Sequence, residues 1–364
     1  MVGSAIDVVL FAPLAPLCGV VLLWFIQMLF IEWQKYLLSK IKREHPAFCR
    51  FTNFMGILFQ TLCHAMGYTA TKSGIAQFKV TVHYGKVKPK REKSGVFEWV
   101  SNSFLFVGPF FIPPLLVLIC FVFTIGGEMP LTLSSKYGFA EGYINFFTNV
   151  YLYLNGFCGF LFSVDLLHPG HLGFLLLLIF VGLGIRPSHV GEDKRRKVNM
   201  FYDLENIWRN IIKKPIYILP IILLLYVFSY VSFLLNTAWG TNNNWYVFLF
   251  TIFGWLSITA IASIFISQLL VLLVKYIDQI KENKRFLVYS TPFVSYISAR
   301  ILFYAHPTEY YKTMSLIIMI FTTAFVTFLL LGNNTNKFKT MIAMKLMRKK
   351  NVGDGDGTKR IVEQ

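Results

Sequence analysis

Long apolar runs constrain the fold of this chain more than any other feature of its sequence. Three of them, Ile6–Glu32, Pro215–Trp239 and Trp245–Tyr276, are long enough to cross a bilayer. A helix rises about 1.5 Å per residue and the hydrocarbon core is about 30 Å thick. Hydrophobic residues make up 55% of the chain and charged residues only 15%, which excludes an ordinary soluble globular protein. The sequence therefore predicts an integral, multi-pass protein of the cell membrane.

The other segments complete the prediction of an all-α polytopic membrane protein with about 6–7 transmembrane helices and a small membrane-associated β-hairpin. The segment 97–125 is expected to span with a bend, because it contains Pro109 and the pair Pro113-Pro114. Further spans are predicted over 172–185 and 314–331.

Three segments leave alternatives open. Residues 51–68 either span with a polar stripe or lie partly embedded, since polar groups at membrane depth must face protein or water. Residues 142–164 form either an interfacial or re-entrant helix, or a full span. Residues 278–312 are expected to lie on the inner face, unless 286–305 dips into the bilayer. The range of span numbers reflects these alternatives.

Changes in composition divide the predicted chain into five parts. They are an N-terminal helix with a basic linker (1–50), a membrane core that includes the hairpin at 74–92 (51–186), a cytoplasmic basic loop (187–214), C-terminal transmembrane helices (215–333) and a basic, partly disordered tail (334–364).

Basic residues gather in short segments between the apolar runs. The formal net charge is +17, and Lys194, Arg195, Arg196 and Lys197 form a cluster in one predicted internal loop. This pattern follows the positive-inside rule and favours contact with a bilayer that contains anionic lipids. No basic-aromatic module of the usual kinds is present, so a specific nucleic-acid partner is not expected.

The hairpin is predicted from alternation over Gln77–Tyr84, with Gly85 as its turn. Alternation places Phe78, Val80 and Val82 on one face, where burial against a partner would engage them. A strand edge of this kind suits a second membrane protein or a transmembrane segment that adds an extended strand.

Two polar motifs interrupt the apolar core and could carry chemistry. Gln60 and His64 lie four residues apart, and this spacing puts them on one face of a helix at the separation used by two histidine ligands of a metal. Asp165, His168 and His171 form the second motif around a Pro-Gly turn. A single histidine on an apolar helix is also commonly a hydrogen-bonded core residue, and both interpretations stay open.

The order of these elements resembles the site-2 protease family of intramembrane zinc metalloproteases, and is most similar to its archaeal branch. The resemblance covers about Phe51 to Trp208 and makes 51–186 the protease-like core. It implies that Gln60 takes the place of the first histidine ligand, Thr61 that of the catalytic glutamate, His64 that of the second ligand and Asp165 that of the third.

That correspondence predicts a lost activity. An amide oxygen is a poor zinc ligand, and a threonine hydroxyl cannot take a proton from zinc-bound water near neutral pH. We therefore expect a pseudoprotease without cofactor that binds another membrane protein.

Two alternatives are kept. The first is an enzyme that holds zinc through His64, Asp165 and either His168 or His171, assisted by an acid such as Glu98. The second is a transporter that uses polar residues within its broken helices.

Overall fold

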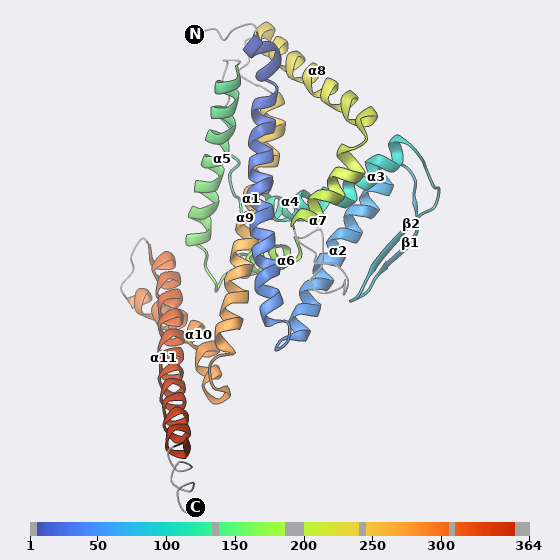
Figure 1. The fold of residues 1–364 in the computed structure, drawn as a ribbon. Helices are drawn as coiled ribbons and strands as arrows, with labels where there is room; N and C mark the ends of the chain where they lie inside the picture. Colours follow the sequence, from blue (N-terminus) through green and yellow to red (C-terminus); the bar gives the residue numbers. More distant parts are fainter. Residues whose placement is uncertain (1–5, 133–137, 186–199, 240–244, 306–309, 354–364) are drawn as a thin grey trace, which may run out of the picture. The chain divides into compact units, whose positions relative to one another are not determined.

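The computed structural model describes residues 6–132, 138–185, 200–239, 245–305 and 310–353, and it is almost entirely helical (Figure 1). The helices are α1 (Leu14–Ile41), α2 (Pro46–Ala70), α3 (Val96–Phe106), α4 (Gly108–Phe123), α5 (Phe139–Phe162), α6 (Pro169–Gly184), α7 (Met200–Ile207), α8 (Pro215–Trp239), α9 (Trp245–Ile277), α10 (Glu282–Ala305) and α11 (Tyr311–Gly353), with short π-helical turns at Asp7–Phe11 and Trp208–Ile212. Strands β1 (Ile75–Val80) and β2 (Gly85–Pro89) form an antiparallel hairpin. The predicted all-α membrane fold with one small hairpin is confirmed.

In the described part of the chain, five helices are long and apolar enough to cross a membrane: α1, α8, α9, α10 and α11. The pair α3 and α4 raises the number to six if it counts as one broken span, and its bend of 63° agrees with the kink expected there. The described residues thus allow five or six spans, and the sequence predicts six or seven, so the two agree at six.

Two predicted segments, α6 and residues 282–304, differ in detail, while α2 and α5 fit the alternatives in which they do not span. Helix α6 has 16 residues, about 24 Å at about 1.5 Å per residue, and is too short to cross the core alone. Helices α2 and α5 are not among the five candidates, because polar residues interrupt their apolar faces. Residues 282–304 form a candidate span rather than an amphipathic segment on the inner face.

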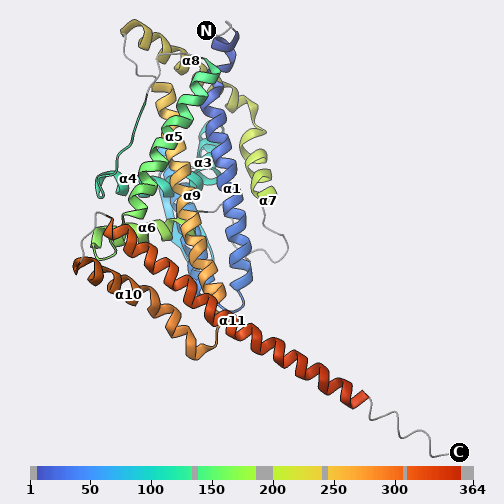
Figure 2. The ribbon, with the colours of Figure 1, turned by 90° about the vertical axis from the view of Figure 1, so that its left-hand side faces the viewer.

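The chain divides into two compact units, residues 1–271 and 272–364, and the division falls within α9. In the first unit, α1, α5 and the first part of α9 run side by side in both views (Figures 1 and 2). Hydrogen bonds join them: the Trp255 indole donates to the Asn149 carbonyl, and the Tyr153 and Thr259 hydroxyls lie 2.7 Å apart. The largest fully buried side chains of this unit are Trp255, Tyr153, Tyr246, Phe110, Phe146, Phe157 and Phe174.

Glutamines on α1 hold the neighbouring elements. Gln34 Nε2 donates to the Gly182 carbonyl at 3.0 Å and to Ser267 Oγ at 2.8 Å, which ties α1 to α6 and α9. Gln27 Nε2 donates to the Phe110 carbonyl at 3.0 Å. That carbonyl needs a donor from outside α4, because Pro113 and Pro114 stand where its helical partners would be and have no N–H.

The second unit consists of the end of α9, α10 and α11. A small core forms around Ile277, Ile280 and Val288, with Leu330 and Leu331 packed against it. The Arg285 guanidinium closes the turn before α10 by donating to the carbonyls of Asp278 and Ile280, each at 3.0 Å. The predicted last span is thus held by a helical hairpin.

Candidate functional site

Gln60, Thr61 and His64, the residues of the first polar motif, lie at the centre of α2. One of them, Thr61, is buried. Thr61 is 5% exposed, and its hydroxyl donates to the Ile57 carbonyl at 2.6 Å. Strand β2 covers it from outside: a β-carbon at Gly85 would collide with Thr61 Oγ1 and Ile57 Cγ2. The position that would hold a catalytic acid therefore has neither an acid nor open space above it.

Gln60 and His64 are both half-buried on α2. The His64 ring lies 4.5 Å from the Tyr68 ring, centroid to centroid, one turn further along the helix. Burial lowers the pKa of His64 below its usual value, which favours the neutral imidazole at pH 7. In this environment a neutral His64 can pack against Tyr68 as an aromatic ring, and it can equally act as a metal ligand.

The hairpin folds back along α2, but its turn differs from the prediction. Gly85 begins β2, and the turn is Thr81–Tyr84. The Thr81 N–H donates to the Tyr84 carbonyl at 2.9 Å, and the Tyr84 N–H donates to Thr81 Oγ1 at 3.0 Å. The threonine hydroxyl thus closes a tight turn, and Val82 lies in that turn rather than on a strand with Phe78 and Val80.

The hairpin has one apolar and one basic face. Phe78 pairs with Val87, and Val80 pairs with Gly85, which faces α2. Since side chains alternate along a strand, the opposite face carries the directly paired Lys79 and Lys86. Phe78 remains 46% exposed, so the hairpin only partly buries its apolar face.

The outer edge of β1 has free backbone groups. The Thr81–Tyr84 pair is hydrogen-bonded, and bonding alternates along an antiparallel ladder. Val80 and Phe78 therefore occupy non-bonded positions, where N–H and C=O point away from β2. Outside the hairpin, no backbone group of the described residues bonds to them, so this edge can accept another strand.

A pocket of about 400 Å³ lies at the base of the hairpin, between α2 and α3. Tyr68, Glu92, Phe97 and Glu98 are among the residues that line it. Burial raises the pKa of Tyr68, and the charges of Glu92 and Glu98 raise it further. Lys93 closes one side, because its Nζ donates to the Thr71 carbonyl at 2.6 Å and lies over the Phe97 ring.

The second polar motif is a local turn between α5 and α6. The Asp165 N–H donates to His171 Nδ1 at 3.0 Å, and Asp165 Oδ1 accepts from the Leu167 N–H at 3.0 Å. The His168 and His171 rings are 4.6 Å apart. Because His171 Nδ1 is an acceptor, a neutral His171 carries its proton on Nε2, the nitrogen that a metal would need.

The structure brings Asp165, His168 and His171 together at this turn and places His64 on α2. Among the described residues, no group of three or more His, Cys, Asp or Glu side chains is arranged to hold a metal ion. The zinc alternative stays a prediction. The basic cluster Lys194–Lys197 lies outside the described residues.

One buried pair was not predicted from the sequence. Lys35 Nζ of α1 and Asp203 Oδ2 of α7 lie 2.7 Å apart, and both side chains are 6% exposed. Lys35 follows the first apolar run, so its place in the sequence indicates a membrane boundary and no particular partner. Asp203, near the start of a short amphipathic helix, was the one feature of the sequence that could have suggested a buried ion pair. Nothing near it in the sequence indicates a partner 168 positions away.

Comparison of the chain with known protein families, curated proteins and solved structures finds no match.

Proposed function

We propose that this chain is a catalytically inactive, site-2 protease-like protein of the cell membrane that binds another membrane protein or a transmembrane segment. The single observation that carries the proposal is the seating of Gly85 on Thr61. Strand β2 occupies the place from which a substrate or a water molecule would reach this position, while β1 presents an open edge.

The proposed contact is strand addition to β1. An extended partner segment would pair with the outward N–H and C=O groups of Phe78 and Val80, and main-chain hydrogen bonds would supply affinity. Phe78 would add burial, since its exposed apolar surface would be covered. The chain would then act as a scaffold rather than as a hydrolase.

Proline substitutions test which edge is used. In Val80→Pro the lost N–H points outward from β1, so the ladder with β2 keeps its bonds. Val87→Pro is the matched control, because Val87 is the non-bonded partner of Phe78 and its N–H points outward from β2. Both variants are expected to keep the hairpin.

The measurement is photo-crosslinking in native membranes from a photoreactive amino acid placed at the exposed Phe78. We expect a discrete adduct with one membrane protein, lost in Val80→Pro and retained in Val87→Pro. Equal adduct yield in both variants would remove the β1 edge from the proposal. Loss in Val87→Pro alone would assign the contact to β2 instead.

A further inference from the structure

The face of the hairpin that is turned away from α2 is basic. Lys79 of β1 and Lys86 of β2 lie directly opposite each other, and Lys88 lies opposite Gln77. All four side chains are exposed. Residues 72–91 contain no Asp or Glu, and their basic residues are Lys72, Lys79, Lys86, Lys88, Lys90 and Arg91. The hairpin therefore presents charge of one sign to its surroundings.

The lysines of this face repel one another. Like charges directly opposite each other on two strands are destabilising, and diagonal neighbours lie within reach of long side chains. Among the described residues, ion pairs join only Lys35 to Glu32 and Asp203, so no carboxylate neutralises the hairpin. Lys79 Nζ lies 5.8 Å from the centre of the Tyr84 ring, a contact that leaves its charge in place. An added anionic group would relieve this repulsion.

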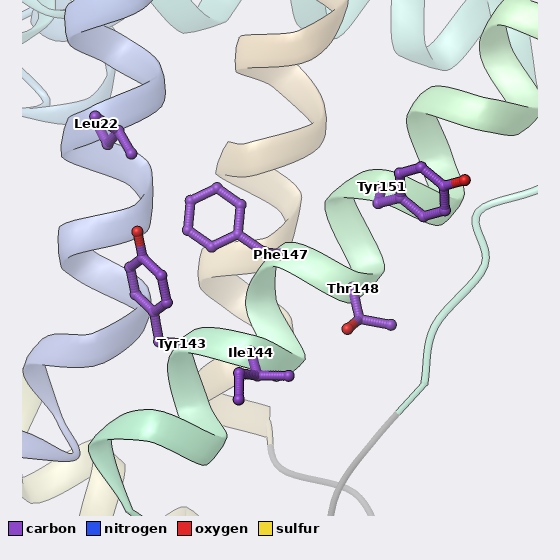
Figure 3. Close-up of a pocket in the computed structure, with 6 residues that line it drawn as sticks. All are labelled: Leu22, Tyr143, Ile144, Phe147, Thr148 and Tyr151. Atoms are coloured by element: carbon purple, nitrogen blue, oxygen red, sulfur yellow. The ribbon is translucent and has the colours of Figure 1, made fainter.

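Another exposed face, on α1 and α5, lacks such a signal. In Figure 3 Tyr143 and Phe147 turn toward Leu22, and none of the described residues that line this face is charged. The hairpin face is the more informative of the two, because its charge fixes the chemistry of a group that would cover it.

The open edge of β1 fixes where such a group would lie. Phe78 and Val80 direct their N–H and C=O groups outward, so a strand added antiparallel would form its hydrogen-bonded pairs with these two residues. Lys79 would then belong to a non-bonded pair, in which the Cα atoms are about 4.5 Å apart and the side chains are close. Since directly opposite residues share a face, one side chain of the added strand would lie beside Lys79 and its two neighbours beside Phe78 and Val80.

We propose that the partner segment alternates acidic and apolar residues, an inference that rests on the strand addition proposed above. A carboxylate lies opposite Lys79, and apolar side chains lie opposite Phe78 and Val80. The apolar side chains cover Phe78, which is 46% exposed. An anionic bilayer surface fits less well, because it neutralises lysines but offers no regular row of donors and acceptors to the outward N–H and C=O groups.

The test uses the full chain in phosphatidylcholine nanodiscs and three short fluorescent peptides, in which valine alternates with glutamate, threonine or lysine. Binding is measured by fluorescence anisotropy. We expect the glutamate peptide to bind most tightly and the lysine peptide least. The glutamate peptide should bind roughly 1.5- to 5-fold more tightly than the threonine peptide, the ratio expected of one cross-strand ion pair.

Variants separate the ion pair from the strand pairing. Lys79→Gln should remove most of the preference for the glutamate peptide. Lys86→Gln is the matched control on the same face and should reduce the preference less, because β2 lies about 4.8 Å further from the added strand. Val80→Pro should abolish binding of all three peptides, whereas Val87→Pro should retain it.

The outcomes distinguish the two proposals. Equal affinity for the glutamate and threonine peptides, with both lost in Val80→Pro, would overturn the acidic pattern and leave strand addition intact. Binding that survives Val80→Pro, or that is absent for every peptide, would refute strand addition at β1 and this inference with it.

Two further results would overturn the inference alone. Equal loss of preference in Lys79→Gln and Lys86→Gln would indicate a diffuse effect of charge rather than a pair with Lys79. Protection of Lys79, Lys86 and Lys88 from acetylation when phosphatidylserine is added to the nanodisc would assign these lysines to the bilayer.

Discussion

Lys35 and Asp203 form a buried ion pair between α1 and α7. Both charges are removed from water, and their attraction offsets the desolvation of each only while both are present. Asp203 also fixes the short helix α7 on α1. A neutral amide at this position keeps the shape and removes the nearer negative charge, leaving the Glu32 carboxylate 3.9 Å from Lys35 Nζ.

Asp203→Asn should therefore lower the free energy of unfolding by about 3–5 kcal/mol, the range for breaking a buried ion pair. The measurement is unfolding in mixed micelles, followed by tryptophan fluorescence. Glu205→Gln on the same helix is the control, because Glu205 is exposed and should change stability little. A loss no larger than that of the control would contradict the assignment.

Residue-level prediction from the sequence succeeded where the relation was local. Gln60 and His64 share α2 because a spacing of four residues is enough to place them on one helix. The pair Lys35–Asp203 could not be predicted, since it depends on how two distant helices pack. The turn at Asp165 brought its two histidines together for the same local reason, whereas His64 belongs to another element.

At the scale of elements, helix α4 depends both on its own prolines and on a glutamine from another helix. Pro109 directly follows the bend, whereas Pro113 and Pro114 lie inside α4 and leave the buried Phe110 carbonyl without a helical donor, because neither has an N–H. Gln27 from α1 supplies that donor. The broken helix and the glutamine should therefore behave as one coupled unit.

Gln27→Leu should cost about 1–3 kcal/mol of stability, because it leaves a buried carbonyl unsatisfied. In a Pro114→Ala background the new N–H can bond to Phe110, so the same Gln27→Leu change should cost less. A double-mutant cycle of unfolding free energies measures this coupling. Additive effects of the two substitutions would show that the prolines and the glutamine act separately.

The hairpin shows what alternation can and cannot predict. Alternating residues correctly indicated strands within 74–92, and β1 holds Phe78 and Val80 as expected. The turn was placed at Gly85 because glycine is the usual turn residue. Here Thr81 closes the turn with its own hydroxyl, and the glycine is needed where β2 meets Thr61.

On the scale of the whole molecule, some glycines lie where helices of residues 1–271 approach closely. Gly182 faces the Ser263 backbone of α9, Gly184 faces Phe59 of α2, and Gly108 faces Cys63. Helices within a membrane associate through such close backbone contacts, since lipid removes most of the hydrophobic drive between them. Composition predicted the membrane class, but which glycines lie at contacts follows only from packing.

Gly182→Ala should destabilise the protein by about 1–3 kcal/mol, because its β-carbon would overlap the Ser263 carbonyl. Gly173→Ala lies on the same helix with nothing within 4 Å of the added carbon. It should be neutral or stabilise by up to about 1 kcal/mol. Thermal unfolding of both variants in one detergent gives the comparison, and equal shifts would refute the packing argument.

The contact between Gly85 and Thr61 also limits which side chains position 61 can accept. A glutamate there would place a larger, charged group against the underside of β2. The hairpin would have to move away from α2 before that carboxylate could meet water or any ligand.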